Sequence, residues 1–94
     1  MLRIHTETAL DGVTLRLEGK LVHPWIDELF RAWTDLDQAR HGRRPVRIDL
    51  DAVSFVDARG RSMLATLQHL GCELKGSGPF ISAVIEEISA GSIF

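Results

Sequence analysis

The chain opens with two stretches in which apolar and polar residues alternate, one on each side of an Asp11-Gly12 pair. Alternation with a period of two is typical of a strand with one buried face, and an Asp-Gly pair between two such stretches favours a tight turn. The pattern therefore predicts a β-hairpin with one apolar face. The apolar positions on that face are Leu2, Ile4, Val13, Leu15 and Leu17.

Three later stretches have the spacing of amphipathic helices. We expect the first to open at Pro24 and to stop near Gly42, the second to run from Ala58 to Gly71, and the third to follow Pro79. The predicted buried positions are Ile26, Leu29, Phe30, Trp33 and Leu36 in the first, Met63, Leu64, Leu67 and Leu70 in the second, and Phe80, Ile81, Val84, Ile85 and Ile88 in the third.

Two short apolar stretches lie between these helices. Alternation over residues 46–50 predicts a third strand, after which Val53, Phe55 and Val56 are expected to close over the core. Cys72 and Leu74 predict a short fourth strand. The order β-β-α-β-α-β-α indicates an α/β fold, with a mixed β-sheet of about four strands and three helices. We expect a single domain over residues 1–94, with its core in 2–88 and a short C-terminal tail at 89–94.

The amino-acid composition limits the kinds of partner and the cellular compartment that we expect for this protein. The chain has 94 residues, 45% of them hydrophobic and 26% charged, with a net charge of −2, which gives no reason to expect a nucleic-acid partner. The basic cluster of Arg40, Arg43 and Arg44 is expected to form a solvated loop. A lone cysteine, Cys72, is expected to be a buried thiol in a reducing compartment. With no apolar run long enough to insert into a membrane and no leader pattern, the sequence predicts a cytoplasmic protein.

The segment from residue 46 to 64 is expected to be a strand, a tight connection and the start of a helix. Asp57 is placed to cap that helix by accepting hydrogen bonds from its free N–H groups. Gly60 has no Cβ, so another backbone or a partner can approach closely there. Arg59 is a cation in the first turn, where it opposes the helix dipole. It is expected to pair with Asp57 or Asp51, to extend into solvent, or to meet an acidic group on a partner.

This segment resembles the STAS family, the sulfate transporter and anti-sigma-factor antagonist domains. The family pattern is a strand ending in Asp-Leu, a Val-x-Phe-x-Asp run and an Asp-Ser-Ser-Gly helix start. The chain has Asp49-Leu50, then a run from Val53 to Asp57, then Ala58-Arg59-Gly60. The resemblance also extends to the expected order of elements from residue 2 to about 88.

The resemblance implies a protein that works by docking on a protein partner, such as an anti-sigma factor or kinase. The serine that is phosphorylated in anti-sigma antagonists corresponds to Arg59, which cannot accept a phosphate. The resemblance therefore implies binding without phosphorylation at that position, in bacterial signal transduction and transcription regulation. The expected partner-binding residues are Ser54, Asp57, Ala58, Arg59, Gly60 and Arg61.

Two alternatives stay open: a soluble accessory subunit of an ABC-type transport system, docking on its ATPase, or a small-ligand sensor. Ser54 and Ser62 are the nearest remaining hydroxyls, and each is expected either to form a local structural hydrogen bond or to serve as a displaced phosphorylation site. Trp25, at the predicted helix start, is a further candidate for an exposed partner contact.

Catalysis, metals and cofactors are not expected. No serine stands beside a base in a pattern typical of hydrolases. Asp49, Asp51 and Asp57 could suggest a magnesium site, but a helix cap and solvated loop acids explain them more simply. The four histidines fall in different predicted elements, without the spacing of a zinc site. These histidines are His5, His23, His41 and His69.

Overall fold

The computed structural model describes residues 1–40 and 45–91, and it confirms the predicted order of elements. The side chains of residues 39 and 40 also lie outside the described part of the chain, and with them the predicted basic loop cluster of Arg40, Arg43 and Arg44. The elements are β1 (Leu2–Ala9), β2 (Gly12–Leu21), α1 (Ile26–Arg40), β3 (Val46–Val56), α2 (Ala58–His69), β4 (Glu73–Lys75) and α3 (Pro79–Gly91).

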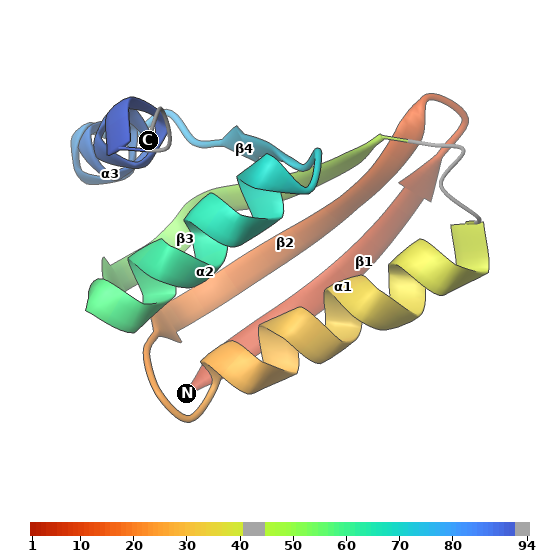
Figure 1. Ribbon diagram of the computed structural model, residues 1–94, viewed down its shortest axis with the longest axis horizontal. Helices are drawn as coiled ribbons and strands as arrows, with labels where there is room; N and C mark the ends of the chain where they lie inside the picture. Colours follow the sequence, from red (N-terminus) through yellow and green to blue (C-terminus); the bar gives the residue numbers. More distant parts are fainter. Residues whose placement is uncertain (41–44, 92–94) are drawn as a thin grey trace.

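The four strands form one mixed sheet in the order β1-β2-β3-β4 (Figure 1). β1 and β2 are the predicted antiparallel hairpin, with Leu2 opposite Gly19 at the far end. Its turn is Leu10-Asp11 rather than the predicted Asp11-Gly12, because Gly12 already pairs with Ala9. β3 runs parallel to β2, and β4 runs parallel to β3. The connections between parallel strands are α1 and α2, as expected for crossovers that bury a sheet face.

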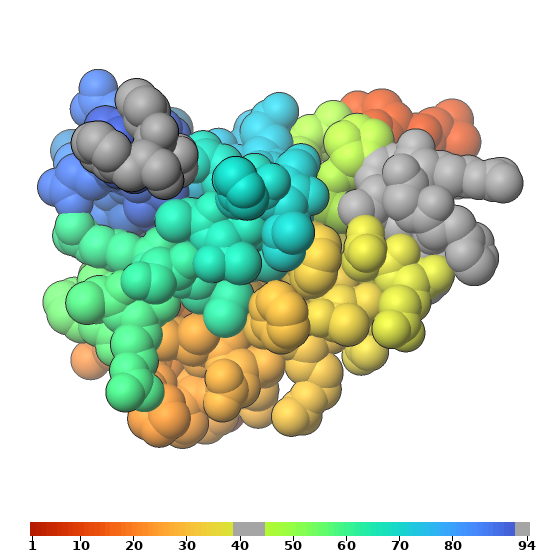
Figure 2. All heavy atoms as spheres, in the orientation of Figure 1, coloured from red at the N-terminus to blue at the C-terminus, as the bar shows by residue number. Residues whose placement is uncertain are grey.

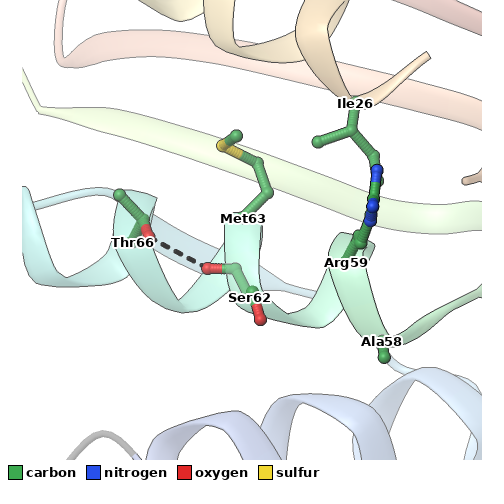
Figure 3. Close-up of a pocket in the computed structure, with 6 residues that line it drawn as sticks. All are labelled: Ile26, Ala58, Arg59, Ser62, Met63 and Thr66. Atoms are coloured by element: carbon green, nitrogen blue, oxygen red, sulfur yellow. Dashed lines mark hydrogen bonds between the residues drawn. The ribbon is translucent and has the colours of Figure 1, made fainter. Parts of the chain in front are cut away.

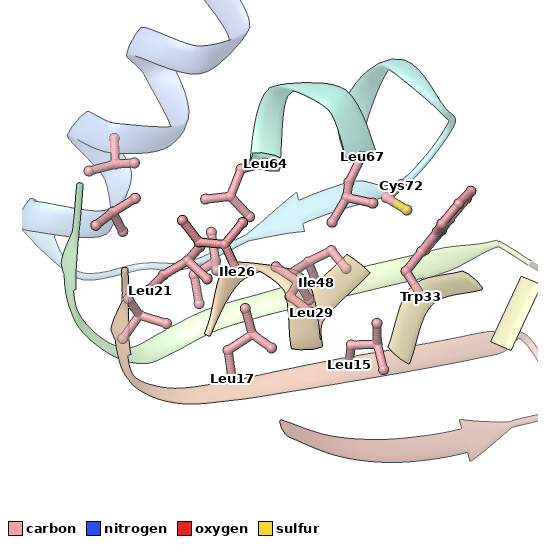
Figure 4. Close-up of a cluster of buried hydrophobic side chains, with 14 of the residues drawn as sticks. Leu15, Leu17, Leu21, Ile26, Leu29, Trp33, Ile48, Leu64, Leu67 and Cys72 are labelled. Carbon is pink, nitrogen blue, oxygen red and sulfur yellow. The ribbon is translucent and has the colours of Figure 1, made fainter. Parts of the chain in front are cut away.

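The core lies between the sheet and the helices (Figure 4). Leucines and isoleucines from β2 and β3 meet side chains from α1 and α2, and many of them have no exposed surface. Burial on every second residue in β2 confirms the predicted one-sided hairpin. The side chains with 0% exposure are Leu15, Leu17, Leu21, Leu29, Ile48, Leu50, Leu64 and Leu67.

Three phenylalanines and Leu70 were predicted to be buried and are exposed, so those predictions were wrong; Leu70 is 48% exposed because α2 ends at His69. Phe30 is 41% exposed, because α1 turns Ile26, Leu29 and Trp33 toward the sheet and leaves Phe30 at the margin, with its ring 5.8 Å from that of Trp33. Phe80 is 42% exposed in the first turn of α3, where the next residue, Ile81, faces the core instead.

The third, Phe55, is 49% exposed because β3 does not end at Leu50 as predicted. β3 continues to Val56, paired with β2, and the ladder shifts register between Gly19 and Lys20. Val53, paired with Gly19 before this shift, and Val56, paired with Leu21 after it, are buried, whereas Phe55 is not.

The start of α1 also differs from the prediction. The helix begins at Ile26, and the carbonyl of Trp25 accepts hydrogen bonds from the N–H groups of Glu28 (3.1 Å) and Leu29 (3.2 Å). Pro24 lies in the preceding turn, after a cis peptide bond, and so does not open the helix. Trp25 is half-buried against the core rather than fully exposed.

The C-terminal third contains the predicted thiol and the third helix. Cys72 is buried, as predicted, and its N–H donates to the carbonyl of Leu67 (2.9 Å) just before β4 begins. α3 continues to Gly91, so the predicted tail begins inside this helix, and residues 92–94 lie outside the described residues. None of the helices in the described residues is long and apolar enough to cross a membrane.

Candidate functional site

The strand–turn–helix predicted from residue 46 to 64 is present, and Asp57 fixes its turn. One Asp57 carboxylate oxygen accepts a hydrogen bond of 2.7 Å from the N–H of Gly60, and the Asp57 carbonyl accepts one of 2.9 Å from Arg61. The Asp57 N–H donates to the carbonyl of Leu21 (3.3 Å) at the end of β2. The predicted cap is confirmed, and it also attaches the helix start to the neighbouring strand.

Gly60 allows α2 to lie directly on the end of β2. A Cβ at this position would be 2.4 Å from the carbonyl oxygen of Leu21 and 2.9 Å from a methyl group of Val56. The prediction of a close backbone approach is therefore confirmed, and the approaching backbone is the chain's own. Gly60 is buried, so it positions the helix rather than offering a side-chain surface to a partner.

Arg59 extends from the first turn of α2 into solvent. It forms no ion pair with any residue that the structure describes, since the two expected acceptors are engaged elsewhere. Asp57 binds Gly60, and Asp51 accepts hydrogen bonds from the N–H (2.7 Å) and hydroxyl (3.2 Å) of Ser77. Of the three expectations for Arg59, intramolecular pairing is therefore wrong.

The Arg59 side chain borders a groove of about 380 Å³ between the start of α1 and the exposed face of α2 (Figure 3). Apolar atoms of Ile26 on α1 and of Met63 on α2 contribute to its lining, together with the hydroxyl-bearing residues Ser62 and Thr66 of α2. The groove thus combines an apolar surface with a cation, at one end, that has no ion pair among the residues that the structure describes. Its lining residues are Ile26, Ala58, Arg59, Ser62, Met63 and Thr66.

Arg61 faces the other way. It forms an ion pair with Glu87 of α3, and both residues border a second groove, of about 400 Å³, between α2 and α3. Ser62 lines both grooves, so the exposed face of α2 is a ridge with a groove on each side. Figure 2 shows this ridge, in green to teal, between α1 in orange to yellow and α3 in blue.

The structure does not bring all the predicted site residues together. Ser54 lies on β3, where its hydroxyl donates to the carbonyl of Gly19 (3.3 Å), as expected of a hydroxyl with a local structural role. It lines neither of these two grooves. Ala58 and Arg59 line the first groove, Arg61 lines the second, and Asp57 and Gly60 shape the helix start beneath them.

Sequence reasoning did not include four residues of the first groove among the partner-binding residues: Ile26, Ser62, Met63 and Thr66. Ser62 was considered only for a local hydrogen bond or as a displaced phosphorylation site. A helical stripe connects Ala58, Ser62 and Thr66 at intervals of four residues, and this signal could have identified Thr66. Ile26 was assigned to the core alone, and nothing in its own segment indicates that α1 brings it beside α2.

The carboxylates that were considered as metal ligands take part in backbone contacts. Asp49 accepts a hydrogen bond of 3.0 Å from the N–H of Asp51, and Asp51 in turn holds Ser77. Within residues 1–40 and 45–91, no group of three acidic, histidine or cysteine side chains is arranged to hold a metal ion.

Known proteins resemble this chain in structure rather than in sequence. No family model matches the sequence, and no curated protein does. The crystal structure of an anti-sigma factor antagonist from Mycobacterium paratuberculosis superposes with a TM-score of 0.80 at 18% identity, covering 100% of this chain and 83% of the other. The anti-sigma factor antagonist SpoIIAA, in its unphosphorylated form, gives a TM-score of 0.66 at 19% identity, over 89% of this chain and 82% of the other.

A part of the protein Mglu is also similar. It matches 80% of this chain at 30% identity with a TM-score of 0.61, but that match spans only 19% of Mglu. The two antagonists are each matched over more than four fifths of their length, by a chain with the element order β-β-α-β-α-β-α. The chain therefore has the fold of a STAS domain, the fold of the anti-sigma factor antagonists.

Proposed function

We propose that the chain is a non-catalytic protein-binding module that docks a regulatory partner on the exposed face of α2. The observation that carries this proposal is Arg59, an exposed cation without an ion pair among the described residues, beside a groove with apolar wall atoms. An apolar contact next to an unpaired charge is a combination that protein interfaces use for affinity and specificity.

The charge of Arg59 defines the chemistry of the partner. A carboxylate or a phosphate group on the partner would form a charge-assisted hydrogen bond with this guanidinium. Arg61 contributes less to this contact, because Glu87 already neutralises it. We infer a partner segment with an apolar side chain for the groove and an acidic group positioned for Arg59.

The family likeness suggests the class of partner. Both antagonists with this fold are described as antagonists of anti-sigma factors. The proposed partner is accordingly an anti-sigma factor or related kinase in a bacterial cytoplasm, where docking would regulate transcription. Because Arg59 has no hydroxyl, phosphorylation at this position does not control the docking.

A pull-down from the native host with the unmodified chain, followed by mass spectrometry, identifies the partner. Affinity for the purified partner is then measured by calorimetry for Arg59→Ala, Arg59→Glu and Thr66→Arg, which adds bulk to the groove. We expect a loss of about tenfold or more for Arg59→Glu and a smaller one for Arg59→Ala. Lys75→Glu, an equal charge reversal on β4 away from both grooves, is the matched control.

Unchanged affinity in all three groove variants would overturn the proposed docking surface. The identity of the captured protein tests the class of partner separately. Recovery of a transport ATPase instead of an anti-sigma factor or kinase would contradict the regulatory assignment while leaving the docking surface in place.

A further inference from the structure

β1 is an unprotected edge of the sheet. β2 lies on one side of it, and no strand of the described residues lies on the other. Proteins usually protect such edges with short strands, bulges, proline or charged side chains, especially lysine. The two charged residues of β1, Arg3 and Glu7, have opposite signs. The opposite edge, β4, has only three residues, whereas β1 has eight, pairs with β2 without a bulge, and contains neither proline nor lysine.

The hydrogen-bonding pattern between β1 and β2 shows which backbone groups of β1 face β2 and which face the open edge. The N–H of Lys20 donates to the carbonyl of Met1 (3.3 Å), so these two residues form a hydrogen-bonded pair of the antiparallel ladder. Such pairs alternate along the ladder. The odd-numbered residues of β1 therefore direct their backbone groups to β2. The residues whose backbone groups face the open edge are Leu2, Ile4, Thr6 and Thr8.

We propose that β1 pairs with β1 of a second copy of this chain, antiparallel and centred on His5. The two-fold axis at His5 places Ile4 opposite Thr6 of the second copy and Leu2 opposite its Thr8. All of these residues have outward-facing backbone groups, so each opposed pair exchanges two hydrogen bonds. The result is a continuous eight-stranded sheet with an isologous interface.

The charges of β1 are self-complementary in this register. Arg3 lies opposite Glu7 of the second copy, and the symmetry produces this pair twice. It falls at the non-hydrogen-bonded positions, where opposed side chains approach most closely. Within each chain, Arg3 is opposite Glu18, and Glu7 lies 3.5 Å from Arg16. The dimer therefore extends these contacts into a row of alternating charge across four strands.

In the two neighbouring registers, Arg3 and Glu7 do not lie opposite each other. Centring on Ile4 places Arg3 opposite His5 and Glu7 opposite Met1, so neither residue lies opposite a side chain of the other charge. Centring on Thr6 places Arg3 opposite Ala9. Only the register centred on His5, among these three, satisfies both charged residues of the strand.

The residues at the two ends of β1 support the same register. Met1 is 76% exposed and Leu10 is 97% exposed, both unusual for large apolar side chains. Centring on His5 places Met1 opposite Ala9 of the second copy, whereas Leu10 follows in the turn. Each end of the interface thus covers Met1, an apolar side chain that a monomer leaves in water.

Sedimentation equilibrium over a range of protein concentrations tests the dimer. We expect the mass to rise from 10.5 kDa toward twice that value. Arg3→Glu and Glu7→Arg each replace two attractive pairs by two repulsive ones, so each should weaken the dimer about tenfold or more. The double variant Arg3→Glu/Glu7→Arg exchanges the charges and should restore the dimer. Lys75→Glu, the same kind of change at the opposite edge, should leave it unaffected.

Amide hydrogen exchange locates the contact. In the dimer, the amides of Ile4, Thr6 and Thr8 should become protected as the protein concentration increases. Circular dichroism of each variant distinguishes lost pairing from lost folding. A chain that stays at 10.5 kDa at every concentration overturns the proposal. It is also overturned by a dimer that both single charge variants leave intact, or by one in which these three amides gain no protection.

Discussion

The carboxylate of Asp57 and the backbone N–H of Gly60 are joined by a hydrogen bond of 2.7 Å that closes the first turn of α2. This bond supplies a partner to an N–H group that the helix itself cannot satisfy. The same residue connects the helix start to β2 through its own N–H.

Replacing Asp57 by alanine should lower the free energy of unfolding by about 1 kcal/mol, because the cap is lost while the backbone contacts remain. Asp57→Asn retains an acceptor oxygen and should lose much less. Urea unfolding monitored by circular dichroism compares the two variants. Equal losses would show that the negative charge, rather than the hydrogen bond, stabilises this helix start.

Gly60→Ala should destabilise the fold by about 1–3 kcal/mol, although alanine is the better helix former. The new methyl group would meet the carbonyl oxygen of Leu21 at 2.4 Å, and a backbone group cannot move aside without disturbing β2. Gly91→Ala in α3 is the matched control, because no described atom beyond its chain neighbours and its own helix backbone lies within 4 Å of the position that its methyl group would take. A Gly60→Ala variant as stable as the unmodified chain would disprove the close contact between α2 and β2.

Asp51→Ala should lower the free energy of unfolding by about 0.5–1.5 kcal/mol and increase amide exchange at the start of α3. Asp51 accepts hydrogen bonds from both the N–H and the hydroxyl of Ser77, which hold the connection between β4 and α3 against β3. Ser77→Ala removes only the longer of these bonds, so its effect should be smaller. If the amides at the start of α3 exchanged at the same rate in Asp51→Ala as in the unmodified chain, the hydrogen bonds from Ser77 to Asp51 would not be what orders the connection between β4 and α3.

Glu18 should titrate below its ordinary pKa of 4.5. A hydrogen bond of 2.9 Å from the His5 side chain lowers this pKa, and nearby positive charge on His5, Arg16 and Arg3 acts in the same direction. The folded state therefore favours the carboxylate. The resulting stabilisation is present above pH 4.5 and is lost as the pH falls through the lowered value.

Carboxyl chemical shifts followed by NMR during acid titration measure this pKa directly. His5→Ala should raise the pKa of Glu18 toward 4.5, because the hydrogen bond and the largest neighbouring contribution are removed. Glutamine does not titrate, so Glu18→Gln should remove the part of the pH dependence of the free energy of unfolding that Glu18 contributes. A Glu18 pKa that does not respond to the His5 substitution would mean that the two side chains are not paired in solution.

Much of the local structure could be predicted from the sequence, because short-range patterns determine it. Alternation around Asp11-Gly12 identified the hairpin, and helical spacing identified the three helices. The cap at Asp57 follows from the type of residue at the junction between a strand and an amphipathic stretch. These features depend on neighbours within a few positions, so they can be recognised without knowing what packs against them.

The exposed phenylalanines could not be predicted in this way. Phe30, Phe55 and Phe80 each stand next to a buried residue in the sequence, and each was assigned to the same apolar face as that neighbour. The apolar residues of a segment show approximately how wide its buried face is, but not where that face ends. Which residue at its margin is buried depends on the angle of the helix or on a register shift in the ladder, and these are properties of the packed structure.

Some features of the candidate site could also be predicted from the sequence, whereas others depend on tertiary packing. The sequence predicted a helix with a capped start after a strand, and the resemblance to STAS domains implied that Arg59 corresponds to their phosphorylated serine. Only the tertiary structure separated Arg59, unpaired among the described residues beside Ile26, from Arg61, which Glu87 neutralises. Ile26 and Glu87 are each far along the chain from the arginines they accompany. Helix and strand patterns extend over a few residues, whereas the charge and shape of a surface depend on which distant segments the fold brings together.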